Sequence, residues 1–418
     1  MEACRNEEST QRERNRRQEL LMSDGTPAYP FRLPDALSPP SEWADLRAKE
    51  PVAPVRLPSG DRALLLTRYD DVRRVLSDPR FTRHSDADDA ARVTANEAGG
   101  VFGEKLTEDA LHQRWRQVIS RAFTAKRVQA MQPRIEEMAE SLVTAMIERG
   151  APADLMAELG FPLPRSVICD QLGVPDPDRD RFGHWSDTLL SMTRFTQAEI
   201  DAAQAEFGAY FAAHIAAKRA NPGDDLISEF IRFTDEFDGQ LSEAIIIGTS
   251  QGLLVAGYET TASMIGKMVA LLLAEPDRWA QLRADPGLVR TAVEEVLRFD
   301  ANPGFGMPRY LSAEVEVADR ALPSGTTVVC SLAAANRDDR TFADGDRMDL
   351  GRTPNPHLAF GVGPHACVGQ ALARIELQTV LQVLLRRLPT LELAEPPAAL
   401  ATRDGLVVGG LARVLVRW

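Results

Sequence analysis

Residues 360–374 read Phe-Gly-Val-Gly-Pro-His-Ala-Cys-Val-Gly-Gln-Ala-Leu-Ala-Arg. Two glycines and a proline precede Val368, so regular structure is not expected before that residue. From Ala371 onward, apolar residues recur at helical spacing. Cys367 therefore lies where a loop becomes a helix, and the free N–H groups and the positive dipole end of a helix start favour a thiolate there.

A thiolate framed by glycines is typical of the proximal ligand of a haem iron, because glycines let the backbone approach a large flat group. The alternative is a buried structural cysteine beside a turn. That alternative accounts for a lone cysteine, but not for the surrounding Phe-Gly-x-Gly-x-His-x-Cys-x-Gly pattern. The stretch resembles the haem-binding loop of the cytochrome P450 family in its soluble bacterial form. The resemblance implies a mainly α (α+β) fold with a large helical part, a small β-sheet part, and haem b between a long central helix and the Cys-loop helix.

Composition narrows the class of protein further. The chain has 418 residues and a net charge of −13, which argues against general nucleic-acid binding. Its four cysteines have no paired spacing, so neither a zinc site nor a disulfide framework is expected. The most apolar run, residues 245–256, is interrupted by polar residues and glycines and is too short to span a bilayer. We expect a cytoplasmic monomer with one P450 domain over residues 25–418. Residues 1–24 are expected to be a disordered or extended tail, unless the true start codon is the one at Met22 and the given start lies upstream of it.

Secondary structure is predicted from periodicity and turn residues. Helices are expected over residues 69–76, 111–123, 128–148, 162–171, 178–193, 197–219, 243–274 and 287–299. Strands are expected at residues 55–57 and 63–67, which form a hairpin, at 315–317 and 326–329, and in a hairpin over residues 405–418. Residues 82–107 lack periodicity and predict a long functional loop.

The second motif is Ala256-Gly257-Tyr258-Glu259-Thr260-Thr261 in the middle of the long helix. The Thr260 hydroxyl can donate a hydrogen bond to the carbonyl of Ala256 and open the helix locally. A small-residue crossing point between packed helices is the structural alternative. Together with the Cys loop, the motif resembles the family's dioxygen-binding groove, in which Glu259 and Thr260 deliver protons.

Several residues are expected to contact haem through the resemblance. His112 and Arg116 lie four residues apart on one helix face, and with Arg309 and His365 they match the family's propionate ligands. A solvated charged helix is the alternative for the first two. The remaining expected contacts are Ala256, Phe360 and Gly369, with Cys367 as the iron ligand.

Glu295 and Arg298 lie three residues apart and can pair on one helix face. Their order between the two motifs matches the family's buried ion-pair helix, with Arg352 as the candidate third partner. Their role is expected to be structural.

The resemblance implies a monooxygenase that inserts one oxygen atom of O2 into an organic substrate by hydroxylation or epoxidation. Electrons would come from NAD(P)H through a ferredoxin reductase and a ferredoxin. The ferredoxin could dock on a basic cluster of Arg114, Arg121, Lys126 and Arg127, although ordinary solvated charge explains that cluster equally well. The alternatives are another haem-thiolate oxidation, such as oxidative coupling or a peroxygenase reaction, and a non-catalytic haem protein that binds a ligand.

The substrate is expected to be bulky and mostly apolar, because the pocket candidates are mostly apolar or small. A macrolide or other polyketide of antibiotic biosynthesis fits this description. The candidate pocket residues are Arg194, Leu253, Asn302, Phe305 and Val407.

Overall fold

A computed structural model describes residues 25–83, 90–94, 109–236, 242–301 and 305–418. The predicted tail over residues 1–24, most of the predicted loop over residues 82–107, and Asn302 lie outside the described residues.

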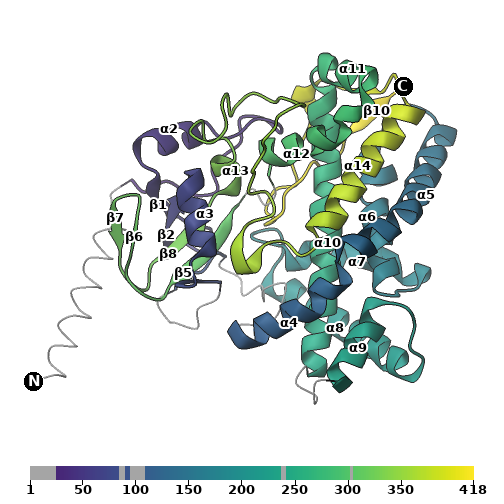
Figure 1. The fold of residues 1–418 in the computed structure, drawn as a ribbon, viewed down its shortest axis with the longest axis horizontal. Helices are drawn as coiled ribbons and strands as arrows, with labels where there is room; N and C mark the ends of the chain where they lie inside the picture. Colours follow the sequence, from purple (N-terminus) through teal and green to yellow (C-terminus); the bar gives the residue numbers. More distant parts are fainter. Residues whose placement is uncertain (1–24, 84–89, 95–108, 237–241, 302–304) are drawn as a thin grey trace, which may run out of the picture.

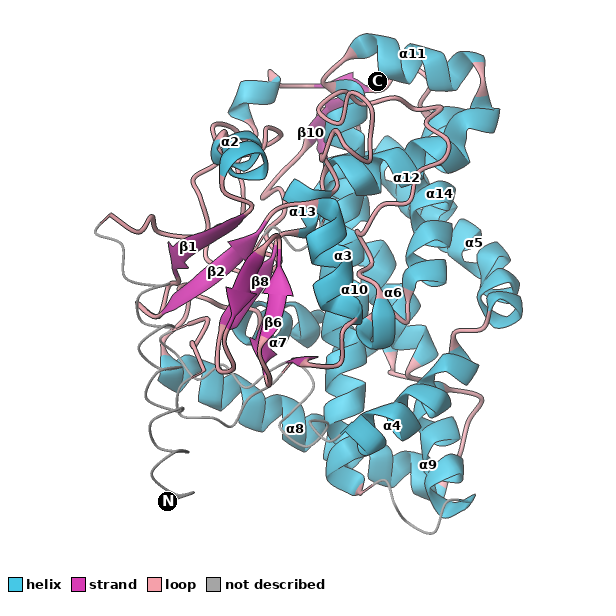
Figure 2. Ribbon diagram, turned by 60° about the vertical axis from the view of Figure 1, so that its left-hand side comes forward, coloured by secondary structure: helices cyan, strands magenta, loops and turns pink. Residues whose placement is uncertain are grey.

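Helices make up most of the described chain, and they gather on one side of the molecule (Figures 1 and 2). The α-helices are α2 (Glu42–Lys49), α3 (Tyr69–Ser77), α4 (Asp109–Ala122), α5 (Ala125–Arg149), α6 (Pro162–Gln171), α7 (Phe182–Leu189), α8 (Gln197–Ala220), α9 (Leu226–Glu236), α10 (Glu243–Leu273), α11 (Pro276–Ala284), α12 (Val289–Phe299), α13 (Leu332–Ala335) and α14 (Gln370–Arg387). Short 3-10 or π turns are η2 (Met156–Gly160), η3 (Asp176–Arg181), η4 (Pro286–Leu288), η5 (Gly363–His365) and η6 (Pro397–Ala399).

The strands form a main sheet on the other side of the molecule and two smaller sheets, with the last strand beside the helices near the C-terminus (Figures 1 and 2). They are β1 (Val52–Arg56), β2 (Arg62–Leu66), β3 (Phe81–Thr82), β4 (Ala153–Asp154), β5 (Met307–Leu311), β6 (Val315–Val317), β7 (Arg320–Leu322), β8 (Thr327–Cys330), β9 (Glu392–Leu393) and β10 (Leu415–Arg417). The main sheet has the order β1-β2-β8-β5-β3, in which β2 and β8 are parallel and the other neighbours antiparallel. The expected hairpin is confirmed, with Val55 opposite Ala63.

Helix α10 crosses the middle of the helical part, with α14 beside it (Figure 1). Most of its residues are buried, because it is apolar on all sides and packs against α6, α8 and α14. Ser242 caps its start by accepting a hydrogen bond from the N–H of Ile245. No helix in the described part of the chain is long and apolar enough to cross a membrane.

Two predicted elements differ from the structure. The helix expected over residues 178–193 is a 3-10 turn followed by α7, which ends at Leu189. The hairpin expected over residues 405–418 is absent: Val416 in β10 lies opposite Ala153 and Leu393 instead. Thr402 and Leu411 form an isolated antiparallel bridge, so the chain folds back on itself earlier than predicted. Alternation along a strand indicates which face is buried but does not identify its partner.

Candidate active site

A cavity of about 280 Å³ lies between α10 and the loop that leads into α14. Its walls come from α4, α6, α10, β5 and the segment from Ala359 to Leu377, which are far apart in the sequence. All of the predicted cofactor contacts line it: His112, Arg116, Ala256, Arg309, Phe360, His365, Cys367 and Gly369. The fold therefore brings the separate motifs of the sequence to one place.

The loop before α14 is shaped by its glycines. Gly363 has φ +78°, and a Cβ added there would lie 2.5 Å from the carbonyl oxygen of Leu76 on α3. Only glycine fits this left-handed, crowded position without strain. The N–H of Cys367 donates to the carbonyl of Phe360 over 2.8 Å and closes the loop. Cys367 is exposed because its side chain opens onto the cavity, and no disulfide engages it.

The pKa of the Cys367 thiol is raised in the protein alone. Although the side chain is exposed to the cavity, it lies deep within the protein, and desolvation is the largest cause. The backbone N–H groups of Gly369 and Gln370, with the positive charges of Arg116 and Arg374, oppose that effect without overcoming it. The helix start therefore favours the thiolate, as predicted, but in the protein alone burial outweighs this effect. A metal ion bound to a cysteine deprotonates the thiol outright.

Cationic and imidazole side chains converge on one side of the cavity. The rings of His112 and His365 lie 4.3 Å apart, and Arg309 is 3% exposed. Helix α4 is held in place because Trp115 Nε1 donates to Thr249 Oγ1 of α10 over 2.8 Å. That bond fixes the helix face that carries His112 and Arg116 toward the cavity.

These groups make the cavity suited to an anionic ligand. Burial first, and then the nearby His112, Arg83, Arg309 and Arg116, lower the pKa of His365 to about 3. His365 Nδ1 is buried and has no hydrogen-bond partner among the described residues. Gly369 lines the cavity, and a Cβ added there would meet no protein atom within 4 Å, so the cavity has room for a flat group against the backbone. The concentrated positive charge and the unpartnered His365 nitrogen fit a cofactor that carries carboxylates. The accessible Cys367 thiol fits a thiophilic metal in the same cofactor.

Helix α10 forms the opposite wall. The Thr260 hydroxyl donates to the carbonyl of Ala256 over 2.5 Å, as predicted, and both residues line the cavity. The helix runs without interruption from Glu243 to Leu273. Glu259 is 1% exposed and is not among the residues that line the cavity. It forms an ion pair with Arg403 instead.

The predicted ion-pair network is confirmed. Arg298 donates to both carboxylate oxygens of Glu295 over 2.8 Å, and both side chains are fully buried. Arg352 Nε lies 3.1 Å from each of the same oxygens. Arg298 also donates to the backbone carbonyls of Asn336 and Gly345. The network ties α12 to the segment that leads to the Cys loop.

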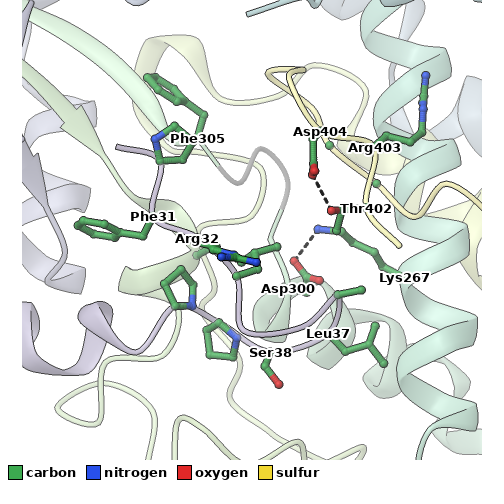
Figure 3. A pocket seen from close by; sticks show the side chains of 18 of the residues that line it. Phe31, Arg32, Leu37, Ser38, Lys267, Asp300, Phe305, Thr402, Arg403 and Asp404 are labelled. Atoms are coloured by element: carbon green, nitrogen blue, oxygen red, sulfur yellow. Dashed lines mark hydrogen bonds and ion pairs between the residues drawn. The ribbon is translucent and has the colours of Figure 1, made fainter. Parts of the chain in front are cut away.

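The predicted substrate residues divide between two cavities. Leu253 lines the cavity at Cys367, whereas Phe305 and Val407 line a larger one of about 590 Å³ (Figure 3). Phe31 lies near Phe305 in the larger cavity. Arg194 lines neither cavity; its guanidinium lies 3.7 Å from Asp187.

The comparisons with known proteins agree with this geometry. Residues 287–408 match the family model described as cytochrome P450. The nocardicin C N-oxygenase of Nocardia uniformis subsp. tsuyamanensis is 44% identical over 398 residues, which cover 94% of this chain and 99% of that protein. The chain belongs to the cytochrome P450 family. The mycinamicin IV hydroxylase/epoxidase of Micromonospora griseorubida is 41% identical, with 94% of this chain and 98% of that protein covered. The solved structure of the putative thioether synthase SgvP has a TM-score of 0.90 and 40% identity, and the match covers 94% of this chain and all of that one.

The protein is therefore a P450 monooxygenase with the mainly helical P450 fold, and membership of the family implies haem, O2 and redox partners that supply electrons. Two residues at the P450 site were not predicted from the sequence. Arg83, just after β3, lines the cavity beside Arg309, and Arg403 pairs with Glu259. Neither belongs to a motif, and only the tertiary fold places them there.

Proposed function

We propose that this P450 holds iron protoporphyrin IX in the cavity at Cys367, with the Cys367 sulfur as the iron ligand. The observation that carries the proposal is the convergence of an accessible cysteine and several cationic side chains on one cavity. His112, Arg116, Arg309 and His365 would bind the two propionates, and Arg83 would add to them. The arginines would supply the positive charge that buried carboxylates need, and the imidazoles would supply N–H donors. Gly369, Ala256 and Phe360 would contact the flat faces of the ring.

The bound haem would supply dioxygen activation, with thiolate ligation favouring O–O cleavage. The Thr260 hydroxyl donates its hydrogen to the Ala256 carbonyl at the cavity wall, so its oxygen is left to accept a hydrogen bond. It would thereby hold a proton donor in place at the reaction site. Glu259, on the same turn of α10, would exchange protons between the interior and Thr260. Proton delivery from one side favours oxygen insertion over the release of peroxide.

The substrate would be a bulky, mostly apolar natural product, with a macrolide or other polyketide as the specific candidate. Two observations support this proposal. The relatives include an enzyme named for mycinamicin, and the apolar residues Phe31, Phe305 and Val407 line part of the larger cavity, which charged residues such as Lys267 and Asp300 also line. Leu253 would contact the part of the substrate nearest the reacting oxygen.

Electrons would come from NAD(P)H through a ferredoxin reductase and a ferredoxin. Of the proposed docking cluster, Arg127 pairs with Glu229 over 2.7 Å and Arg121 lies over the ring of Phe233, while the side chain of Arg114 is outside the described residues. Lys126 is exposed. We therefore propose that the ferredoxin contacts Lys126 and Arg121, whose guanidinium stays positively charged over the Phe233 ring. We also propose that residues 25–418 act as one monomeric catalytic unit in the cytoplasm.

Coupling of electron use to product formation tests the monooxygenase mechanism. With ferredoxin, its reductase and an accepted substrate, Thr260→Ala should consume NAD(P)H but release more peroxide and less product than the wild type. Thr291→Ala is the matched control, because Thr291 of α12 lines neither cavity and its hydroxyl likewise donates to a backbone carbonyl, that of Leu288, over 3.0 Å. Equal coupling in the wild type and Thr260→Ala would overturn the role of Thr260. Product formation from peroxide alone, without reductase, at the full rate would favour a peroxygenase.

A further inference from the structure

Arg403 connects three separate elements of the fold. It lies in the chain reversal between Thr402 and Leu411, and its guanidinium donates to Glu259 of α10 and to Asp187 of α7. The side chain is 13% exposed. Arg403, Thr402 and Asp404 all line the larger cavity, and in Figure 3 the Arg403 side chain points away from the other two. Its guanidinium is held by the carboxylates of Glu259 and Asp187.

The backbone around Arg403 is held in place from both sides. The N–H of Arg403 donates to the carbonyl of Gly410 over 2.8 Å, and Ser263 of α10 donates to the carbonyl of Gly409 over 3.0 Å. The N–H of Met192, in the segment after α7, donates to the carbonyl of Gly405 over 2.7 Å. Because the turn is anchored to the same elements that its side chain bridges, the guanidinium reaches Glu259 with little freedom to move.

Glu259 is the acid that this arrangement constrains. One carboxylate oxygen pairs with Arg403, and the other, Oε2, is buried without a hydrogen-bond partner among the described residues. Burial raises the pKa of Glu259 to about 7; Arg403 opposes this rise, Asp187 adds to it, and Arg194 opposes it weakly. Tyr258 is the other titratable neighbour, and its own pKa is raised by burial and then by Glu259. A carboxyl poised near neutral pH is suited to exchanging protons.

We propose that Arg403 is a positioning residue for the reaction: it fixes one oxygen of Glu259 and leaves the other free to exchange protons with the active site. The inference rests on the proposed role of Glu259 and deepens it. Asp187 contributes to this arrangement, because its carboxylate competes with that of Glu259 for the Arg403 guanidinium. A purely structural clamp between α7, α10 and the turn would use the same contacts and would also affect the proton affinity of Glu259, but its loss would change coupling whether or not Glu259 is present.

Infrared titration of the holoenzyme tests the link between Arg403 and Glu259 without measuring turnover. The carboxylic acid C=O band that disappears in Glu259→Gln reports the protonated acid. In Arg403→Gln this band should persist to higher pH, by about one to three pH units, because an adjacent arginine lowers a carboxyl pKa by about that amount. In Asp187→Asn it should be lost at lower pH, because Arg403 is then shared with no second carboxylate. Opposite shifts cannot come from general loosening of the fold, and an unchanged titration in both variants would overturn the proposal.

Coupling measurements then separate this inference from the proposed function. Arg403→Gln should raise the peroxide released per NAD(P)H in the wild-type background and have no further effect in a Glu259→Gln background. Equal effects in both backgrounds would show that Arg403 does not act through Glu259. If Glu259→Gln leaves coupling unchanged, the proposed relay fails, while the infrared titration still decides whether Arg403 controls Glu259. Arg403→Lys keeps the charge and should restore part of the coupling; if Arg403→Gln does not fold, Arg403→Lys and Asp187→Asn carry the same titration test.

Discussion

Replacing Arg298 with methionine should destabilise the protein strongly without touching the reacting atoms. Arg298 and Glu295 are both 0% exposed, and Arg298 also donates to the carbonyls of Asn336, Gly345 and Arg347. Removing one member of a buried ion pair costs about 3–5 kcal/mol, because the remaining charge stays buried. Glu295 would keep Arg352, which moderates the loss, while three carbonyls would lose a donor. We expect the free energy of unfolding to fall within that range of about 3–5 kcal/mol.

The matched control is Arg417→Met. Arg417 and Glu392 also form an arginine–glutamate pair, 2.6 Å apart, but their side chains are 56% and 60% exposed. Exposed pairs contribute about 0–1 kcal/mol, so this variant should unfold close to the wild type. Urea unfolding, followed by tryptophan fluorescence and by circular dichroism, gives both midpoints, and haem content is measured on the same samples. Equal midpoints for the two variants, or full stability and haem content in Arg298→Met, would refute the reasoning.

Two further predictions concern the Cys loop and acid stability. Gly363→Ala should reduce haem content, because its Cβ would lie 2.5 Å from the Leu76 carbonyl and a left-handed backbone costs a non-glycine residue about 1–2 kcal/mol; a pyridine haemochrome assay checks this, and full haem loading would contradict it. Burial alone would raise the pKa of Glu294, but hydrogen bonds from His357 and Arg374 lower it from 4.5 to about 2. Its stabilisation is therefore present above pH 4.5 and lost as the pH falls toward 2. Glu294→Gln should unfold at a midpoint that varies less over this range than that of the wild type, as urea titrations at several pH values would show; an unchanged profile would contradict the assignment.

Much of the site was predictable because its residues lie in contiguous motifs. The Cys loop, the Glu259-Thr260 pair and the Glu295-Arg298 pair depend on spacing along one helix or turn, where local geometry fixes which side chains meet. The long helix and the first hairpin followed from periodicity and turn residues for the same reason. The contact of Arg352 with Glu295, 57 residues apart, was instead expected only through the resemblance to the family.

The remaining features depend on tertiary contacts. Arg83 and Arg403 enter the site from a strand end and a chain reversal, and no pattern in the sequence links them to Cys367 or Glu259. The pairing of β10 with β4 and β9 was missed because strand alternation does not name a partner. The raised pKa of Cys367 was missed because desolvation depends on the depth of the cavity, which the helix start alone does not reveal.

The ligation of iron by Cys367 is the central claim, and the absorption spectrum of the reduced protein under carbon monoxide tests it most directly. The wild-type protein should show the strongly red-shifted Soret band of thiolate-ligated haem, and Cys367→Ala should lose it. A wild-type band at the position of histidine-ligated haem, or a red-shifted band that persists in Cys367→Ala, would contradict the claim.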